Sequence, residues 1–200
     1  MNLISNPSKN LLPYQGIVWD YGKVLSPEAC ENYFAELFKK MPWEADELMM
    51  FGRRIITKRK TAWIGDQGIR YTYSHRTKIP TPWSPPLIEI KAKIEKITSA
   101  QFNACLLNLY HNGQEAMGWH SDDEKELGND PLIASLSLGT ARKFSFRHKT
   151  TKEKVSLELV DGQLLLMKGE TQKYWSHSLH RSAKIHEPRI NLTFRYIHPS

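Results

Sequence analysis

Two histidines and one aspartate have the types and the order of a metal-binding set. His120 and Asp122 are two residues apart, and His177 follows much later in the chain. Such a set leaves positions on a bound Fe(II) ion open for a chelating cosubstrate and O₂, as in non-haem iron oxygenases. A zinc hydrolase can use the same three ligands. Other residues must therefore distinguish the two kinds of enzyme.

Two arginines after the second histidine favour the oxygenase. Arg189 and Arg195 lie in a run that also contains Asn191 and Thr193. A guanidinium group binds a carboxylate through two parallel hydrogen bonds and stays charged at any working pH, which suits a dicarboxylate such as 2-oxoglutarate. A zinc hydrolase has no need of this pair. Together the residues predict an enzyme that uses Fe(II), 2-oxoglutarate and O₂.

The same run predicts a strand with one polar and one apolar face. Residues two apart share a face, so the polar residues from Arg189 to Arg195 point one way and the apolar residues between them point the other. At about 3.3 Å per residue the two arginines lie roughly 20 Å apart, too far to hold one carboxylate together. We expect one at the far carboxylate of 2-oxoglutarate and the other near the iron. Asn108 and Tyr110, also two apart, can add an amide and a phenol hydroxyl.

The composition favours an intracellular protein with a polyanionic partner. The 200 residues carry a formal net charge of +7, and Lys and Arg cluster at 53–60 and 142–154. Near the aromatic and metal segments, these clusters predict phosphate contact. Cys30 and Cys105 have no metal-type spacing, and the chain shows neither a signal peptide nor an apolar run of about 18 residues. We expect a monomer without membrane contact, cytoplasmic in a bacterium or nuclear in a eukaryote.

Helices are predicted in the first half of the chain and short strands in the second. Ser26-Pro27 is typical of a helix start, with apolar residues at helical spacing up to Pro42, and Ser84-Pro85-Pro86 opens a second helix. Glycines separate short alternating runs from residue 103 onward. The strands expected there span 104–110, 132–138, 142–148, 154–159, 163–168 and 189–197.

This pattern predicts a mainly β fold with flanking helices, of the α+β class. Many short strands around the ligand residues favour a double-stranded β-helix, or jelly roll, with the helices packed outside it. We expect a single oxygenase domain over 1–200. Within it, 1–102 would form an N-terminal helical extension for nucleotide recognition that acts as a substrate lid, and 103–200 the catalytic core.

Six segments carry a family resemblance. They are Asn108-Leu-Tyr110-His-Asn-Gly, Trp119-His-Ser-Asp-Asp-Glu124, Ile133-Ala-Ser-Leu-Ser-Leu-Gly139, Phe144-Ser-Phe-Arg-His-Lys149, Trp175-Ser-His-Ser-Leu179 and Pro188-Arg-Ile-Asn-Leu-Thr-Phe-Arg195. From about residue 50 to 197 the chain resembles the AlkB family of nucleic-acid dealkylases, most closely its eukaryotic branch typified by human AlkB homologue 2. The resemblance implies DNA repair: an alkylated base, usually 1-methyladenine or 3-methylcytosine, flips into the pocket, its methyl carbon is hydroxylated, and formaldehyde leaves.

The resemblance also implies site residues. The iron ligands would be His120, Asp122 and His177, and the 2-oxoglutarate contacts Asn108, Tyr110, Arg189, Asn191, Thr193 and Arg195. The positions implied for substrate binding are Phe51, Tyr71, Tyr73, Ser74, Glu124 and Arg147. The tyrosines would stack on the extruded base, an interaction worth about 1 to 3 kcal/mol per base. Glu124 would accept a hydrogen bond from its exocyclic amine, and Phe51 would fill the gap left in the duplex.

Two other readings keep the same iron and cosubstrate residues. An oxygenase of this kind could act on RNA or on a protein side chain, and would then not need Tyr71, Tyr73 and Glu124 to line a base pocket. A catalytically silent binding module would not need its intact ligands and both arginines. The connection after Lys149 is shorter than the basic loop of that branch, so single- and double-stranded DNA both remain open as substrates.

Overall fold

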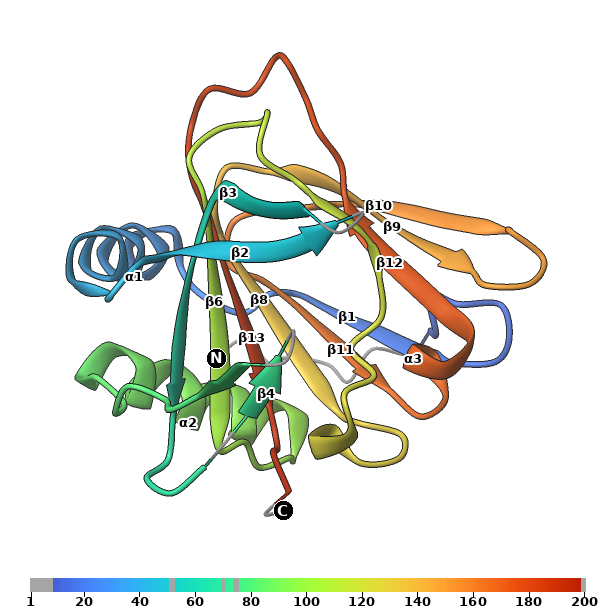
Figure 1. Ribbon diagram of the computed structural model, residues 1–200, viewed down its shortest axis with the longest axis horizontal. Coiled ribbons are helices and arrows are strands. Elements are labelled where there is room, and N and C mark those ends of the chain that lie inside the picture. The colour runs from blue at the N-terminus through green and yellow to red at the C-terminus, as the bar shows by residue number, and fades with distance from the viewer. Residues whose placement is uncertain (1–8, 51–52, 70, 74–75, 199–200) are drawn as a thin grey trace.

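Two facing β-sheets form the centre of the molecule (Figure 1). The computed structural model describes residues 9–50, 53–69, 71–73 and 76–198, with the side chains of 46–50, 53–55, 71–73 and 76–78 left out of the description. The larger sheet holds, in spatial order, β1 (Ile17–Lys23), β11 (Gln163–Lys168), β8 (Ile133–Gly139), β13 (Arg189–Arg195), β6 (Ala104–Tyr110), β3 (Arg53–Gly65) and β2 (Glu44–Met50). The smaller sheet holds β10 (Lys154–Leu159), β9 (Arg142–His148), β12 (Trp175–Leu179) and β7 (Met117–His120).

The strands pair antiparallel within both sheets, and β4 (Tyr71–Tyr73) with β5 (Arg76–Lys78) forms a separate short hairpin. A seven-stranded and a four-stranded antiparallel sheet packed face to face are a jelly roll, as the sequence predicted. Two short helical segments, η1 (Lys125–Leu127) and α3 (Thr171–Tyr174), connect strands next to the smaller sheet.

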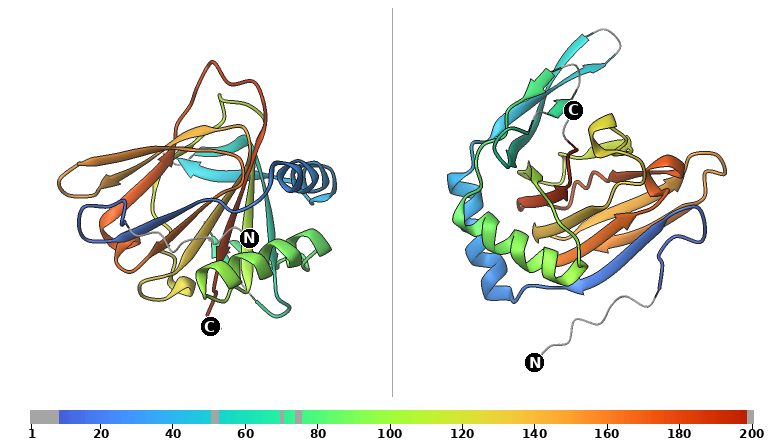
Figure 2. Two further views of the ribbon diagram at one scale, coloured as in Figure 1. Left: turned by 180° about the vertical axis from the view of Figure 1, so that it is seen from behind. Right: turned by 90° about the horizontal axis from the view of Figure 1, so that it is seen from below.

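Two longer helices cover the outer face of the seven-stranded sheet (Figure 2). Helix α1 (Pro27–Lys40) starts as predicted, with the Ser26 hydroxyl accepting a hydrogen bond from the Ala29 amide at 3.2 Å. Helix α2 (Pro85–Thr98) buries apolar residues against the same sheet. Both predicted helices are therefore confirmed. None of the helices in the described residues is long and apolar enough to cross a lipid bilayer.

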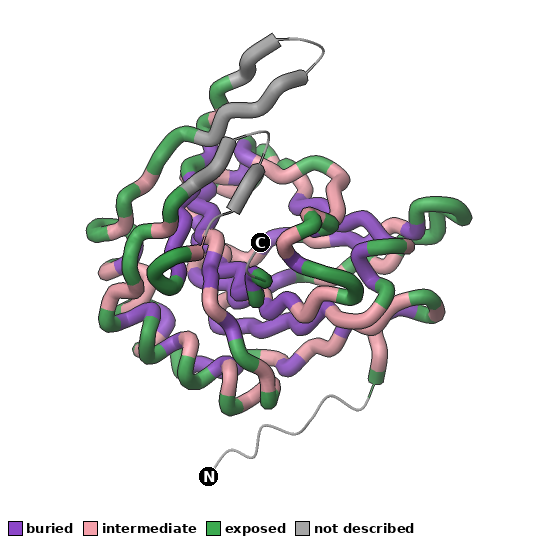
Figure 3. Tube along the Cα trace, turned by 60° about the horizontal axis from the view of Figure 1, so that its bottom comes forward, coloured by how far each residue is buried: buried purple, intermediate pink, exposed green. Residues whose placement is uncertain are grey.

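The main apolar core lies between these helices and the large sheet. It contains the alternate apolar residues of the central strand β13, namely Ile190, Leu192 and Phe194. In Figure 3 the buried residues gather along the segments of the trace in the middle of the molecule. Because one face of β13 is committed to this core, its other face must point between the two sheets.

All six predicted strands are present, and further strands add to them. β1 and β3 come from the first half of the chain, where only helices were predicted, yet β1 pairs with β11 and β3 pairs with β6. The large sheet thus draws strands from both sides of residue 103. The division into a lid-forming extension and a catalytic core stays a prediction.

Candidate active site

The three predicted metal ligands come together beside the small sheet. β7 and β12 are neighbouring antiparallel strands in which His120 lies opposite His177, with their ring centroids 4.2 Å apart. Asp122 follows two residues after β7 ends at His120. One ligand atom from each of these residues lies within 4.8 Å of the others. The distant His177 is close in space because the sheet pairs its strand with that of His120.

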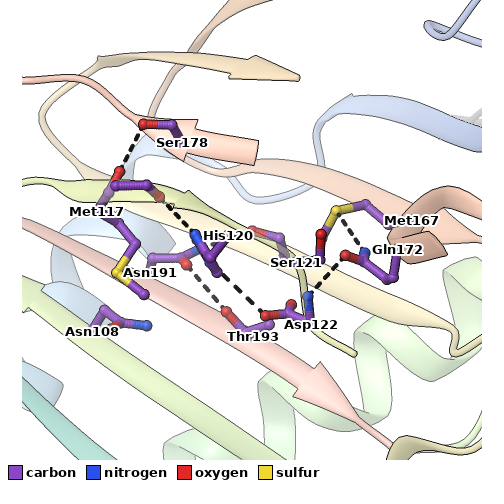
Figure 4. A network of polar contacts seen from close by, with 12 residues as sticks. Asn108, Met117, His120, Ser121, Asp122, Met167, Gln172, Ser178, Asn191 and Thr193 are labelled. Carbon is purple, nitrogen blue, oxygen red and sulfur yellow. Dashed lines mark hydrogen bonds and ion pairs between the residues drawn. The ribbon is translucent and has the colours of Figure 1, made fainter. Parts of the chain in front are cut away.

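One hydrogen bond orients the ring of the first histidine. His120 Nδ1 donates to the Gly118 carbonyl oxygen at 2.8 Å, which fixes the ring tautomer and leaves Nε2 with its lone pair, 3.9 Å from Asp122 Oδ1 (Figure 4). His177 is buried against the rings of Phe144 and Phe146, and its Nδ1 has no hydrogen-bond partner among the described residues. No described protein group competes for this ring nitrogen, so the buried imidazole is compatible with a metal ligand.

Electrostatics keep the set in its metal-binding protonation state. Burial would raise the pKa of the Asp122 carboxyl, but the Arg195 guanidinium, 3.1 Å from Oδ1, together with His177 and His120, lowers it instead. Burial and then the charge of His120 lower the pKa of His177 to about 3, against the opposing effect of Asp122. At neutral pH the carboxylate is ionised and the His177 ring is neutral. These are the forms that bind metal ions.

A cavity of about 120 Å³ opens between the sheets next to the three ligands. The residues expected to contact 2-oxoglutarate all lie on its wall: Asn108, Tyr110, Arg189, Asn191, Thr193 and Arg195. Four of them come from β13 and two from its neighbour β6, with Asn191 in register with Asn108. The predicted polar face of 189–195 therefore lines this cavity.

The two arginines of β13 occupy different parts of the wall. Arg195 contacts the metal ligand Asp122, while Arg189 donates from Nη2 to the Ser137 hydroxyl at 2.8 Å and lies 5.8 Å from the centre of the Tyr110 ring. Burial lowers the pKa of Arg189 to about 10, so its guanidinium is still charged at neutral pH. The Arg195 guanidinium therefore lies against a metal-ligand residue, and the Arg189 guanidinium lies at a different part of the wall.

The amide and hydroxyl between these arginines are also held in place. Asn191 Nδ2 donates to the Ser135 hydroxyl at 2.8 Å and to the Leu136 carbonyl oxygen at 3.1 Å, and Thr193 donates to Asn191 Oδ1 at 3.1 Å. Since fixed donors and acceptors lose little entropy when a ligand binds, this part of the wall is preorganised.

Arg59 belongs to the cavity, which the sequence did not indicate. Its place between Lys58 and Lys60 suggested a phosphate-binding cluster, but only 4% of its surface is exposed, and its guanidinium donates to the Asn108 side-chain oxygen. Arg59, Thr61 and Trp63 line the cavity at every second position of β3. That period of two is the signal that could have separated Arg59 from its exposed neighbours.

Arg142 was predicted to belong to a basic cluster that contacts phosphate, but the structure places it elsewhere. Only 1% of its surface is exposed, and its guanidinium donates to four carbonyl oxygens, those of Asn112, Gly113, Glu115 and His180. These carbonyls belong to two loops, one before β7 and one after β12. Arg142 therefore holds together the loops that flank the metal-binding strands, and it does not face solvent.

The residues expected to bind the substrate differ in what the structure describes. Glu124 lines the cavity, and its Oε2 is buried without a hydrogen-bond partner among the described residues. Arg147 lies outside the cavity wall, with its guanidinium 4.3 Å from the centre of the Trp119 ring. Tyr71 and Tyr73 form β4, but their side chains are not described. Phe51 and Ser74 fall outside the described residues.

Comparison with known proteins agrees with this arrangement. The profile of the 2OG-Fe(II) oxygenase superfamily matches residues 20–195. The chain is 38% identical over 197 residues to the DNA oxidative demethylase ALKBH2 of Bos taurus, covering 93% of this chain and 71% of that protein. It is 40% identical over 179 residues to the alpha-ketoglutarate-dependent dioxygenase alkB homolog 3 of Bos taurus, covering 84% and 62%. The solved structure of OsALKBH1 shares the fold, with a TM-score of 0.59 at 14% identity over 92% of this chain and 98% of that one.

The jelly roll, the ligand set and the superfamily match define an oxygenase that depends on Fe(II), 2-oxoglutarate and O₂. Within that superfamily the chain belongs to the AlkB family, near ALKBH2. The predicted fold, family, class of enzyme and cofactors are confirmed.

Proposed function

We propose that this protein removes alkyl groups from damaged DNA bases by oxidation, with 1-methyladenine and 3-methylcytosine as substrates. The name DNA oxidative demethylase, carried by relatives from Bos taurus and Homo sapiens at 38% and 36% identity, supports this substrate class. The observation that carries the proposal is the buried Oε2 of Glu124, which has no hydrogen-bond partner in the described part of the chain and lies in the cavity that the metal ligands also line. A buried polar atom is costly unless a ligand completes its hydrogen bonds.

In this proposal one set of residues in the cavity binds iron and another binds 2-oxoglutarate. His120, Asp122 and His177 hold the iron, and Arg195 keeps the Asp122 carboxylate ionised and aimed. Arg189 binds the far carboxylate of 2-oxoglutarate, with Asn108, Tyr110, Asn191 and Thr193 completing the cosubstrate wall. When bound, iron and 2-oxoglutarate together activate O₂ to oxidise a C–H bond, with succinate and CO₂ as the cosubstrate products.

The substrate base enters from the duplex or single strand by flipping out of its stack. Tyr71, Tyr73 and Ser74 bind it, the two tyrosines by stacking, and Glu124 accepts a hydrogen bond from the exocyclic amine that adenine and cytosine share. Residues 1–102 supply the lid, Phe51 fills the vacated stack, and Arg147 binds a phosphate. Adding one oxygen atom to the methyl group gives an N-hydroxymethyl base, which breaks its N–C bond to release formaldehyde and the repaired base.

The test is mass spectrometry of single- and double-stranded oligonucleotides that carry 1-methyladenine or 3-methylcytosine, incubated with Fe(II) and 2-oxoglutarate. The expected result is a loss of 14 mass units, about one CH₂ group, only when the cosubstrate is present. Matched RNA oligonucleotides measure the nucleic-acid preference. Formation of succinate with every oligonucleotide unchanged would overturn the proposal while keeping the oxygenase.

We also propose that the protein acts as a monomer on intracellular DNA. The absence of a membrane-crossing helix among the described helices is compatible with this setting. Light scattering coupled to gel filtration, with and without an oligonucleotide, measures the assembly directly. A stable dimer in the absence of DNA would contradict the monomer.

A further inference from the structure

One buried side chain links the two chain segments that carry the metal ligands. Gln172 lies in the short helix α3, directly before the strand β12 that carries His177. Only 2% of its surface is exposed. Its side-chain oxygen accepts a hydrogen bond at 3.0 Å from the backbone amide of Asp122, which follows strand β7 (Figure 4). The amide orientation follows from chemistry, because a backbone N–H can only donate to the oxygen of a glutamine side chain.

The rest of Gln172 is fixed as well. Its side-chain nitrogen lies 3.6 Å from Met167 Sδ, and its backbone carbonyl oxygen accepts a hydrogen bond from Lys149 Nζ at 2.7 Å. A second link runs parallel to it, since the Ser121 hydroxyl donates to the Trp175 carbonyl oxygen at 3.1 Å. The Asp122 segment is therefore attached to the α3–β12 segment at two neighbouring points.

Asp122 needs such support because it lies beyond the end of β7, where no strand pairing holds its backbone. Arg195 fixes the carboxylate at Oδ1, but that contact sets only the tip of the side chain. A ligand must keep both its tip and its backbone in place to preserve metal geometry, and residues that orient ligands commonly influence metal affinity about 10- to 100-fold.

We propose that Gln172 is a positioning residue for the metal site: it holds the Asp122 backbone so that the carboxylate meets the two histidines at one point. This proposal rests on the assignment of His120, Asp122 and His177 as the iron ligands. Gln172 does not line the cavity and so does not touch the cosubstrate or the base. Its effect reaches the reaction only through Asp122.

The test compares side chains of similar length at position 172. Gln172→Met fills the same space without a strong acceptor, whereas Gln172→Glu keeps an oxygen where the Asp122 amide needs it. Lys173→Ala is the matched control, because Lys173 lies next along α3 but is exposed, and its contacts to Glu170 and to the Tyr174 ring do not involve a metal ligand. Mn(II) serves as the probe, since it shares the preference for oxygen and imidazole ligands and does not react with O₂ during the titration.

Calorimetric titration of each metal-free protein with Mn(II) gives the dissociation constant. We expect Gln172→Met to bind Mn(II) about 10- to 100-fold more weakly, Gln172→Glu to recover most of that loss, and Lys173→Ala to match the wild type. Without metal, Gln172→Met should lower the melting temperature by a few degrees, because it leaves the buried Asp122 amide without an acceptor. The rise in melting temperature on adding Mn(II), measured for each variant against its own metal-free value, should shrink for Gln172→Met. Equal affinities for Gln172→Met and the wild type would overturn the proposal.

Two further measurements separate the possible failures. In the wild-type protein without metal, nuclear magnetic resonance should show slow hydrogen exchange of the Asp122 amide; rapid exchange would overturn the proposal even where a variant does not fold. His120→Ala should abolish Mn(II) binding. If the wild-type protein itself failed to bind Mn(II), the ligand assignment would be wrong, and this role of Gln172 would fall with it.

Discussion

The two sheets of the jelly roll contribute different chemistry to one cavity. The large sheet is covered by α1 and α2 on one face, and its central strands β13 and β6 present fixed polar groups on the other. The small sheet carries both histidines, on β12 and on its edge strand β7. A central strand fixes a row of groups by pairing on both sides, whereas an edge strand is paired on one side only. The positions of the metal ligands thus depend on local side-chain contacts, whereas the positions of the residues on the cosubstrate wall depend on strand pairing in the large sheet.

The sharpest test of this division removes a metal ligand from the small sheet. We expect His177→Ala to abolish Fe(II)-dependent formation of succinate, a loss greater than the roughly 100-fold upper range for residues that only orient ligands. Binding of Mn(II) should disappear with it. Retention of full turnover would show that the metal is held elsewhere.

A substitution on the large sheet should leave metal binding unchanged. Arg189→Lys keeps the charge but loses the planar fork, so we expect the KM for 2-oxoglutarate to rise about 10- to 100-fold, the value of one charge-assisted hydrogen bond. Titration with Mn(II) should give the wild-type affinity. A parallel loss of Mn(II) affinity would mean that the two sheets do not act separately.

Glu124 lines the same cavity, and its substitution should change neither Mn(II) binding nor 2-oxoglutarate binding. Glu124→Ala is expected to lower kcat/KM for a methylated oligonucleotide about 10-fold through one lost hydrogen bond to the base. The KM for 2-oxoglutarate and the Mn(II) affinity should stay unchanged. Glu158→Ala, on the exposed face of β10, is the control. Unchanged repair kinetics in Glu124→Ala would remove this residue from the base pocket.

The last prediction concerns stability as a function of pH in the metal-free protein. His177 has a folded pKa of about 3, lowered mainly by burial, whereas an unfolded histidine titrates near 6.5. The unfolded chain therefore binds more protons between about pH 6.5 and 3, and the free energy of unfolding should fall as the pH falls through that window. Arg189, on the large sheet, titrates near pH 10 and does not contribute there.

Urea unfolding of the chelator-treated protein at several pH values between about 7 and 5 measures this slope. His177→Ala should make the slope shallower, because the variant lacks one of the two histidines whose pKa is lowered in the folded state; His180 is the other. An identical slope in the variant would assign the pH dependence to another residue.

The sequence predicted those parts of the site that have a short local pattern. The alternation of polar and apolar residues from Arg189 to Arg195 predicted a strand with one polar face, and that face lines the cavity. The order of two histidines and one aspartate predicted the metal-binding set. It did not predict that Arg59 and Arg142 are buried, because each stands next to an exposed lysine in the chain. Adjacency suggests a common surface, but neighbouring residues of a strand point to opposite faces.

The sequence also did not predict which strands pair with one another. β1 and β3 have polar and charged residues among the apolar ones, so their sequences alone do not predict strands of a central sheet. Only the structure shows that β1 pairs with β11 and β3 with β6. Strand β12 is only five residues long, and although its sequence alternates large residues with serine, all five residues are buried, so the pattern is too short to predict a strand with one exposed face. Such elements form through tertiary contacts, and local propensity gives little information about them.

The two loops that Arg142 joins have a consequence for protein engineering. They approach so closely that a Cβ atom on Gly113 would lie 2.1 Å from the Ser182 carbonyl oxygen, and backbone hydrogen bonds connect Gly113 with Ile185 and Ser182 (Figure 1, top). A chimera that took only one of these loops from a relative would leave the Arg142 guanidinium with some of its carbonyl acceptors out of place. The smallest unit that can be transplanted between family members is therefore both loops together with Arg142.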